Sequence, residues 1–328
     1  MQQFSHFPGR HLAGVFIILL SFLIPGCRAE KATSLRVGIV QPHINESIMV
    51  NPAAHGSMVR EIVKNAAAQK SDLIIFPEYF NVMLATSPWA EIIKSSDSVR
   101  KAIRRISETT DGPRSMRDLF IQQSQMIRKH MDNLYGELAK QYGISILAGT
   151  YFAHDRAADR LTNRAVLYDA EGTVIYEQDK SFLTAFEKSE LQLDAGRPQD
   201  ARLLDFNGIS VGITICRDIF FPVWDDIFMG MDLLIDLRAE GSLWQDSSGS
   251  FYSAIPQRLH GSGGSWAVTS TLTGQFIDLF WQGKSAYISK DISKASITSP
   301  DTYTIRALAE HYDSEDFLLI QLKKDQHE

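Results

Sequence analysis

The segment GISVGITICRDIFFP at residues 208–222 gives the strongest indication of the fold in this sequence. Its first half, residues 209–215, is apolar and rich in β-branched side chains, which predicts a buried strand. Cys216 follows at the end of this strand, so its side chain should lie at the rim of a sheet. Peptide N–H groups just beyond a strand end can point at a bound oxyanion. The segment therefore raises the hypothesis of a nucleophilic cysteine, whereas a small buried apolar residue is the common alternative for a lone cysteine.

Two other predicted strands are each followed by a charged residue. Glu78 follows the apolar run of DLIIFPEYF at residues 72–80, where Pro77 interrupts the strand ladder. A carboxylate in this position is poorly solvated, which raises its pKa toward the range of a working base. Lys180 comes shortly after the short strand expected at residues 174–176. Each charge, taken alone, could also be an ordinary solvated group beside a strand.

Together these three motifs, in the order Glu, Lys, Cys, resemble the nitrilase or carbon–nitrogen hydrolase superfamily. The matching stretches are FPEY around Glu78, DKSFL around Lys180 and ICRDIFFP around Cys216. The resemblance extends from about Leu35 to the C-terminus. It implies an α/β fold, specifically a four-layer α-β-β-α sandwich, and a homodimer paired through a helical face.

The resemblance also implies a reaction. The Cys216 sulfur would attack an amide or nitrile carbon, and Glu78 would act as the base in both half-reactions. Lys180 and the peptide N–H after Cys216 would hold the oxyanion, and one such donor contributes about 3 kcal/mol. Lys180 is also expected to stabilise the thiolate. A supporting glutamate is expected near Lys180: Glu187 is the first candidate and Glu190 the second. No cofactor is implied.

Residues beside these motifs are candidates for binding a small-molecule substrate. The candidates are Tyr79, Phe182, Arg217 and Trp244, and the aromatic ones could equally belong to the core. Two stretches depart from the family pattern. Residues 236–240, DLRAE, lack the usual Asn-Pro-Ser-like run, and residues 257–265 lack an Arg-Ala-x-Glu-Asn motif. These departures concern substrate choice and oligomer packing rather than the three central residues.

The N-terminal residues 1–27 are predicted to be a signal peptide. The apolar run at residues 12–25 is too short to span a bilayer comfortably and suits a signal-peptide core. Gly26 and Cys27 after it resemble a bacterial lipoprotein box, so we expect export and a lipid anchor on Cys27. A cleaved signal peptide with an incidental cysteine, or an uncleaved anchor, is the alternative. Residues 28–34 would be a tether and residues 35–328 a single catalytic domain.

Composition narrows the class of protein. The chain has 328 residues, a formal net charge of −6 and 44% hydrophobic residues, which indicates a soluble globular domain without the basic excess of a nucleic-acid binder. With Cys27 acylated, Cys216 would be left without a disulfide partner, since the chain has only 2 cysteines. No HExxH, CxxC or P-loop motif supports a zinc or nucleotide site. The G-x-S-x-G spacing at residues 208–212 lies within the predicted strand and not at a strand-to-helix elbow, so it does not suggest a serine hydrolase.

The sequence thus predicts an exported amide hydrolase that works through a thioester. Two alternatives stay open: an N-acyltransferase that passes the same acyl-enzyme to an amine, and a catalytically silent binding protein on this fold. Residues 85–141 are expected to be mostly helical, and they could cover the site as a lid or pad the surface.

Overall fold

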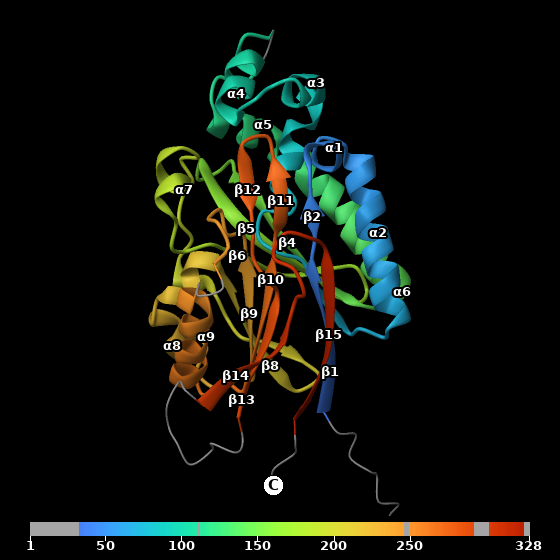
Figure 1. The fold of residues 1–328 in the computed structure, drawn as a ribbon, viewed down its shortest axis with the longest axis vertical. Coiled ribbons are helices and arrows are strands. Elements are labelled where there is room, and N and C mark those ends of the chain that lie inside the picture. The colour runs from blue at the N-terminus through green and yellow to red at the C-terminus, as the bar shows by residue number, and fades with distance from the viewer. Residues whose placement is uncertain (1–32, 110–111, 246–248, 292–301, 325–328) are drawn as a thin grey trace, which may run out of the picture. The chain divides into compact units, whose positions relative to one another are not determined.

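Two six-stranded sheets lie at the centre of the computed structural model (Figure 1). The structure describes residues 33–109, 112–245, 249–291 and 302–324. The predicted signal peptide, Cys27 and most of the tether lie outside these ranges. The described residues belong to the unit Ala32–Glu328. In the described ranges, no helix has both the length and the apolar character needed to cross a membrane.

The first sheet contains the strands that lead to Glu78 and Lys180. In spatial order it consists of β15 (Asp316–Lys324), β1 (Thr33–Gln41), β3 (Leu73–Ile75), β4 (Ser145–Asp155), β5 (Arg160–Tyr168) and β6 (Val174–Asp179). β3 runs parallel to β4, while β5 is antiparallel to β4 and β6 is antiparallel to β5. The carboxyl ends of β3 and β6 and the start of β5 therefore meet at the same edge.

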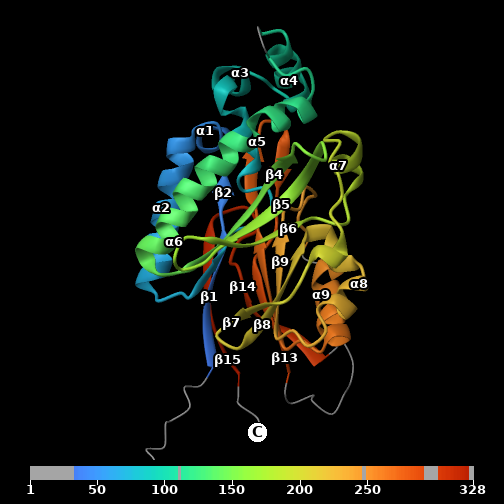
Figure 2. The same cartoon turned by 180° about the vertical axis from the view of Figure 1, so that it is seen from behind.

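The second sheet contains the strand that leads to Cys216. Its spatial order is β14 (Tyr303–Leu308), β13 (Ala286–Lys290), β10 (Trp266–Thr271), β9 (Leu233–Arg238), β8 (Ile209–Ile215) and β7 (Leu204–Phe206). A small three-stranded sheet is formed by β12 (Leu279–Trp281), β11 (Thr273–Phe276) and β2 (His43–Ile44). Its hairpin β11–β12 lies at the end of the large sheets nearest α3 (Ala90–Lys94) and α4 (Val99–Ser107) (Figures 1 and 2).

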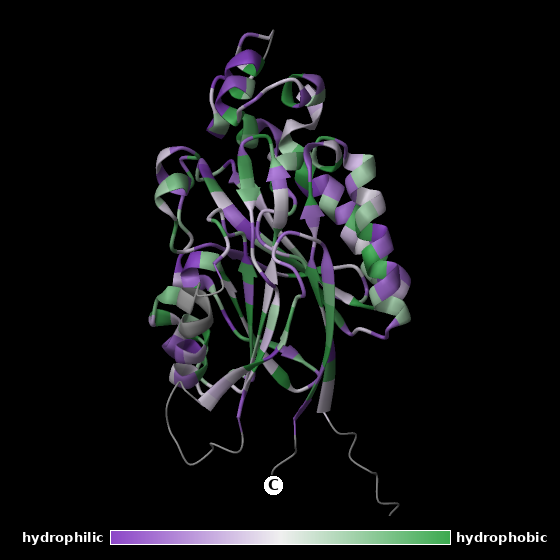
Figure 3. Cartoon of the chain, viewed as in Figure 1, coloured by the Kyte–Doolittle hydropathy of each residue, from purple (hydrophilic) through white to green (hydrophobic). Residues whose placement is uncertain are grey.

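The strand alternation explains why the two sheets stack. Successive side chains of a strand point to opposite faces, so every second apolar residue of β1 and β8 faces the same layer. Leu35, Val37 and Ile39 of β1 pack in one buried cluster with Val211 and Ile213 of β8. Figure 3 shows these central strands as a mainly hydrophobic layer.

Helices cover the outer face of each sheet. The helices α2 (Pro52–Ala68), α5 (Met116–Met131) and α6 (Glu137–Tyr142) share a buried cluster with the first sheet. The helices α8 (Val223–Ile227) and α9 (Gly249–Ser262) pack on the second. The predicted four-layer α-β-β-α sandwich is therefore confirmed.

One predicted strand boundary was wrong. The strand expected to end at Tyr176 continues as β6 to Asp179, because Gln178 and Asp179 still pair with β5. Lys180 is thus the first residue after the strand. The helix α2 begins at Pro52, where the Asn51 side chain accepts the N–H groups of Ala53 and Ala54 and caps the helix.

Residues 85–141 are mostly helical, as predicted. They contain most of the 3₁₀ helix η1 (Val82–Trp89), then α3, α4, α5, the π-helical turn η2 (Asp132–Gly136) and most of α6. The remaining short helices are α1 (Glu46–Met49), α7 (Ala185–Ser189), η3 (Pro198–Asp200) and η4 (Cys216–Phe220).

Candidate active site

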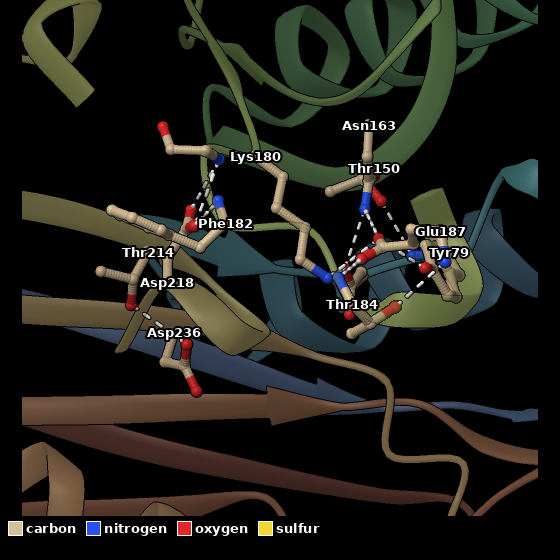
Figure 4. Close-up of polar contacts among 12 residues, drawn as sticks. Tyr79, Thr150, Asn163, Lys180, Phe182, Thr184, Glu187, Thr214, Asp218 and Asp236 are labelled. Carbon is tan, nitrogen blue, oxygen red and sulfur yellow. Dashed lines mark hydrogen bonds and ion pairs between the residues drawn. The ribbon is translucent and has the colours of Figure 1, made fainter. Parts of the chain in front are cut away.

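A buried lysine lies between two carboxylates at the edge of the first sheet (Figure 4). Lys180 Nζ donates to Glu78 Oε1 at 2.8 Å and to Glu187 Oε1 at 2.9 Å. The side chains of Lys180 and Glu78 are 1% exposed and that of Glu187 is fully buried. Burying three charges is unfavourable unless they pair and are hydrogen-bonded, so the surrounding contacts must fix them closely.

Neighbouring residues supply these contacts. Asn163 on β5 donates from Nδ2 to Glu78 Oε1 at 2.8 Å and to Glu187 Oε1 at 3.3 Å. The Tyr79 hydroxyl donates to Glu187 Oε1 at 2.6 Å. Glu187 Oε2 accepts the backbone N–H of Thr184 at 2.8 Å, which forms a capping box at the start of α7. The carboxylates are therefore held by groups that leave little freedom to move.

The structure decides between the two candidates for the supporting glutamate. Glu187 contacts Lys180 directly, whereas Glu190 lies at the end of α7 and pairs with Arg100 at 3.7 Å. The Glu190 and Arg100 side chains are largely exposed. Glu187 is thus the glutamate that the fold places beside the lysine.

The segment that carries Glu78 is shaped by a close backbone approach. Gly149 on β4 has a φ of 70°, and a Cβ at this position would lie 2.1 Å from the Pro77 carbonyl oxygen. Only glycine allows β4 to pass this close. Tyr79, directly after Glu78, has a φ of 62°. Its backbone N–H donates to the Thr150 hydroxyl at 2.9 Å, which holds this strained residue in place.

Cys216 is also a strained residue. It lies at the junction of β8 and η4 with a φ of 52°, in the left-handed region that side-chain-bearing residues rarely adopt. Such outliers persist only where the surroundings enforce them, and they concentrate at functional sites. The turn brings the cysteine to the same cavity as Glu78 and Lys180.

The electrostatics of Glu78 suit a base. Burial raises the pKa of Glu78 to about 7, although the Lys180 ammonium opposes the shift. The Cys216 side chain interacts with the Glu78 carboxyl group. Glu78 Oε2 is buried and has no hydrogen bond of ordinary geometry to any described residue. Oε2 is therefore the oxygen of Glu78 that is left to accept a proton from the thiol.

Lys180 favours the thiolate, as predicted, but other groups outweigh its effect on the pKa of Cys216. Burial raises the pKa of the Cys216 thiol well above its usual range, and the nearby Glu78 carboxylate raises it further. Lys180 lowers this pKa, but it is itself paired with two carboxylates, so its charge is mostly compensated. The resting site thus holds a neutral thiol beside a carboxylate, and the thiolate forms only when Glu78 takes the proton.

Lys180 and Glu187 stay charged near neutral pH. Burial lowers the pKa of Lys180, but Glu78, Cys216 and Glu187 outweigh it and raise that pKa overall. Burial likewise opposes ionisation of Glu187, yet Lys180 and the Tyr79 hydroxyl lower its pKa overall. The lysine can therefore act as a fixed positive charge throughout a reaction.

These groups open into a cavity of about 650 Å³. Glu78, Lys180 and Cys216 line it, and the partly exposed rings of Phe186 and Phe220 lie at its rim. No described residue of the stretch 85–141 lines this cavity, so that stretch does not act as a lid over Cys216 in this structure. A volume of this size is typical of a small-molecule site.

Two of the four predicted substrate-binding residues line the cavity, and two do not. Tyr79 and Arg217 belong to its wall. The Phe182 ring instead stacks on Phe221, with centroids 3.6 Å apart, in the cluster between the second sheet and its helices. The Trp244 ring stacks on Tyr312, with centroids 6.1 Å apart, outside the cavity lining. Phe182 and Trp244 are therefore packing residues, which was the alternative to a role in substrate binding.

Sequence reasoning missed Asn163 and Asp218. Asp218 is fully buried and accepts the backbone N–H groups of Ser181 at 3.1 Å and Phe182 at 2.8 Å (Figure 4). It thereby ties the segment after Lys180 to the turn after Cys216, and burial raises its pKa to about 8. The position of Asp218 two residues after Cys216 was the available signal. For Asn163 the sequence offers no clear signal, because its strand, RLTNRAVLY, contains other polar residues.

A second missed feature is a buried ion pair beside the strand of Cys216. Arg238 donates from Nη2 to Asp236 Oδ2 at 2.9 Å, and Asp236 Oδ1 accepts the Thr214 hydroxyl at 3.0 Å. Both charged residues lie on β9, in the stretch that departs from the family pattern. Asp236 raises and Arg238 lowers the pKa of Cys216, so the pair is part of the electrostatic environment of the thiol.

The described residues offer no metal centre, since no three histidine, cysteine, aspartate or glutamate side chains among them are arranged to hold an ion. Among the polar groups of the cavity are the thiol of Cys216, the carboxylate of Glu78 and the ammonium group of Lys180. They can supply a nucleophile, a base and a charge for an oxyanion.

Comparisons with known proteins agree with this chemistry. The chain matches the family model described as Carbon-nitrogen hydrolase over residues 36–252. No curated protein sequence was found to match it. In fold it is similar to the crystal structure of an amidase from Nesterenkonia sp., with 15% identity, a TM-score of 0.62 and coverage of 90% of this chain and 92% of the amidase.

Two further structures of the amidase from Nesterenkonia sp. AN1 are similar. A double mutant in complex with acrylamide has 14% identity, a TM-score of 0.61 and coverage of 89% and 92% of the two chains. A mutant with the acetamide moiety of fluoroacetamide added at its active-site cysteine has 15% identity, a TM-score of 0.61 and coverage of 90% and 92%. At these identities the similarity shows the shared fold.

The family model covers well over half of the 328 residues and includes Glu78, Lys180 and Cys216. The fold agrees with that of a nitrilase-superfamily amidase. The protein therefore belongs to the carbon–nitrogen hydrolase family.

Proposed function

We propose that the protein hydrolyses a non-peptide amide through a thioester on Cys216, with Glu78 as the base and Lys180 as the oxyanion partner. The observation that carries the proposal is the buried Glu78 Oε2, which has no hydrogen bond of ordinary geometry to a described residue, on a carboxyl group that interacts with the Cys216 side chain. The other oxygen of the same carboxylate is fixed by Lys180 and Asn163. The Glu78 carboxylate is thus oriented to accept a proton through Oε2.

Acylation begins when Glu78 Oε2 accepts the thiol proton and the Cys216 sulfur attacks the amide carbon. The carbon–sulfur bond forms and the carbonyl electron pair moves onto oxygen. Lys180 and the backbone N–H of Arg217, in the first turn of η4 where N–H groups lack intrahelical partners, stabilise the oxyanion. The oxyanion then collapses, the carbon–nitrogen bond breaks, and protonated Glu78 gives its proton to the departing amine.

Deacylation uses the same groups in reverse. A water molecule takes the place of the amine, Glu78 accepts its proton, and the oxygen attacks the thioester carbon. The carbon–sulfur bond breaks as the carboxylic acid forms, and protonated Glu78 returns its proton to the Cys216 sulfur. Because Lys180 remains charged, it stabilises the oxyanion of both half-reactions.

Product analysis tests this proposal against the two alternatives. The purified protein would be incubated with small amides and with the corresponding nitriles, with and without an amine acceptor. Amide hydrolysis releases the amine or ammonia together with the acid. An N-acyltransferase would form a new amide whenever the acceptor is present, and a silent binding protein would form neither product. The similarity to an amidase supports starting the search with amides.

A pH dependence follows from the pKa of Glu78. The ionised carboxylate is the active form, and burial raises its pKa to about 7. Lowering the pH through this value protonates the base, so kcat/KM should fall about tenfold per pH unit on the acid side. Initial rates with a small amide over the range of roughly pH 5 to 9 measure this limb. An acid limb centred near 4.5, the ordinary pKa of a glutamate, would contradict the role of buried Glu78.

We also propose that the protein is exported and anchored through a lipid on Cys27, on the strength of the apolar run and Gly26 before it. Mass spectrometry of the protein from a bacterial membrane fraction should then find acylated Cys27 as the first residue. A Cys27→Ala variant should leave the membrane fraction. An unmodified Cys27, or a mature N-terminus elsewhere, would contradict the anchor. Pairing into homodimers, which sedimentation can test, stays a prediction of the family resemblance.

A further inference from the structure

One edge of the small three-stranded sheet forms part of the wall of the catalytic cavity. Among the strands that the structure describes, β12 pairs with β11 alone, because it is the end strand in the order β12–β11–β2. Its three residues, Leu279, Phe280 and Trp281, all line the cavity. The unpaired side of a strand presents backbone N–H and C=O groups that can pair with another extended chain. We call this side of β12 the free edge.

The register of the hairpin shows which backbone groups point to the free edge. Phe276 and Leu279 are partners in the ladder and flank a turn of two residues. In such a hairpin the two residues beside the turn exchange both hydrogen bonds, and the next pair along the ladder exchanges none. The backbone groups of Leu279 are therefore directed at β11, and those of Trp281 likewise. The N–H and carbonyl oxygen of Phe280, which lies between them, point away from β11 toward the free edge.

Two contacts agree with this direction. Gln282, two residues beyond Phe280, points the same way, and its N–H donates to the Glu240 carbonyl oxygen at 3.1 Å. A Cβ built at Gly241 would lie 3.8 Å from the Phe280 carbonyl oxygen. Phe280 thus faces the segment 239–242, which also lines the cavity, and glycine has no side chain to cover that oxygen. Within the described ranges, no hydrogen bond outside the sheet ladders uses the Phe280 N–H or carbonyl oxygen.

The free edge is held in place before any ligand binds. The turn between β11 and β12 is attached on both sides: Asp278 Oδ1 accepts the N–H of Val99 at the start of α4 at 2.8 Å. Glu46 Oε1 accepts the N–H of Ile277 at 2.6 Å. A fixed edge loses little conformational freedom on binding, so its hydrogen bonds contribute more fully to affinity than those of a loose loop.

We propose that the free edge of β12 binds the substrate as an added strand, so that the substrate class is short peptides that end in a carboxamide. This inference rests on the proposed amide hydrolysis. The Phe280 N–H would donate to the carbonyl oxygen of one substrate residue, and the Phe280 carbonyl oxygen would accept the N–H of the same residue, as in one antiparallel pair. A simple aliphatic amide does not offer this donor and acceptor together.

The peptide is assigned to the acyl part of the substrate. The carbon–nitrogen bond that breaks is then that of the terminal carboxamide, and ammonia is the leaving group. The acyl part stays attached to Cys216 after ammonia has left, so the edge can hold it during both acylation and deacylation. An edge that held the leaving amine would act in acylation alone.

Two pairs of isomeric peptides test the hydrogen bond to the Phe280 carbonyl oxygen. The first pair is acetyl-alanyl-glycinamide and acetyl-sarcosyl-glycinamide; the second is acetyl-glycyl-alaninamide and acetyl-glycyl-sarcosinamide. Within each pair the same methyl group sits on carbon or on nitrogen, so only the sarcosine isomer lacks an N–H. At the position that pairs with Phe280, the sarcosine isomer should have a kcat/KM for ammonia release about tenfold lower. Equal values within both pairs would overturn the proposal.

Substitutions at Phe280 test the other hydrogen bond and locate the effect. An edge strand tolerates proline where the backbone N–H points outward, so Phe280→Pro removes the donor without removing a ladder bond. It should lower the ratio of kcat/KM for acetyl-glycyl-glycinamide to that for acetamide about tenfold. Phe280→Ala is the matched control, because it removes the ring and keeps the N–H, and it should keep the higher ratio. The same ratio in both variants would overturn the role of the edge.

Direct binding separates this inference from the proposed function. Calorimetric titration of the Cys216→Ala protein with the four isomers needs no turnover. Tighter binding of an alanine isomer than of its sarcosine partner, weakened by adding Phe280→Pro, would support the edge even if the wild-type protein hydrolysed no amide, and that second result would overturn only the hydrolysis. Hydrolysis of acetamide by the wild type, combined with equal binding within both pairs, would overturn the edge alone.

Discussion

The Cys216→Ala protein is expected to have no measurable amide hydrolysis while keeping its fold. The sulfur is the only atom in this account that forms a covalent bond to the substrate, and loss of a catalytic nucleophile lowers kcat by roughly 10⁴- to 10⁶-fold. The side chain is small and buried, so its truncation should change the free energy of unfolding by less than about 2 kcal/mol. Steady-state kinetics and chemical denaturation measure the two quantities.

Cys216→Ser serves as the matched control for this variant. It keeps a polar group of similar size at the position with the φ of 52°. A serine hydroxyl is a much weaker acid than a thiol, so Glu78 should not ionise it and activity should stay close to that of Cys216→Ala. Turnover near the wild-type rate in either folded variant would show that another residue is the nucleophile.

Glu78→Gln is expected to give the second largest loss of activity, and both acylation and deacylation should slow. The substitution removes the group that accepts the thiol proton and later the proton of water, and general-base catalysis contributes roughly 10²- to 10⁴-fold for each step it assists. The glutamine carbonyl can still accept from Lys180 and Asn163, so the surrounding contacts should survive. Single-turnover kinetics can follow acylation and deacylation separately.

The matched control for Glu78→Gln is Glu190→Gln. Glu190 is the glutamate that the sequence could not separate from Glu187, and the structure places it outside the site, paired with Arg100. Surface substitutions of this kind change stability by no more than about 0.5 kcal/mol, and Glu190→Gln should leave both half-reactions unchanged. If Glu78→Gln forms and hydrolyses the acyl-enzyme at the normal rate, the carboxylate has only a structural role.

The sequence allowed the central strands and their end residues to be predicted well. Apolar, β-branched runs identified the strands before Glu78 and Cys216, because burial on both faces selects such residues in a central sheet. The end of β6 was missed because Glu177 and Gln178 are polar. They continue the strand through pairing with β5, a contact between segments that local composition does not reveal.

The orientation of side chains at the site was harder to predict than their position along the chain. Tyr79 and Phe182 each come within two residues of a charged residue of the site. Only Tyr79 lines the cavity, because its backbone adopts a φ of 62°, whereas Phe182 stacks on Phe221. The protonation state of the Cys216 thiol also depends on a residue that is far away in the sequence. Burial and the Glu78 carboxylate raise its pKa, although the two residues lie far apart in sequence.

The central claim is that the reaction passes through a thioester on Cys216. Acid quenching during the first turnover with an amide, followed by proteolysis and mass spectrometry, tests it most directly. We expect a single acyl group on the peptide that contains Cys216, released by hydroxylamine and absent from the Cys216→Ala protein. An acyl group on a different residue, or turnover that persists in the Cys216→Ala protein, would contradict it.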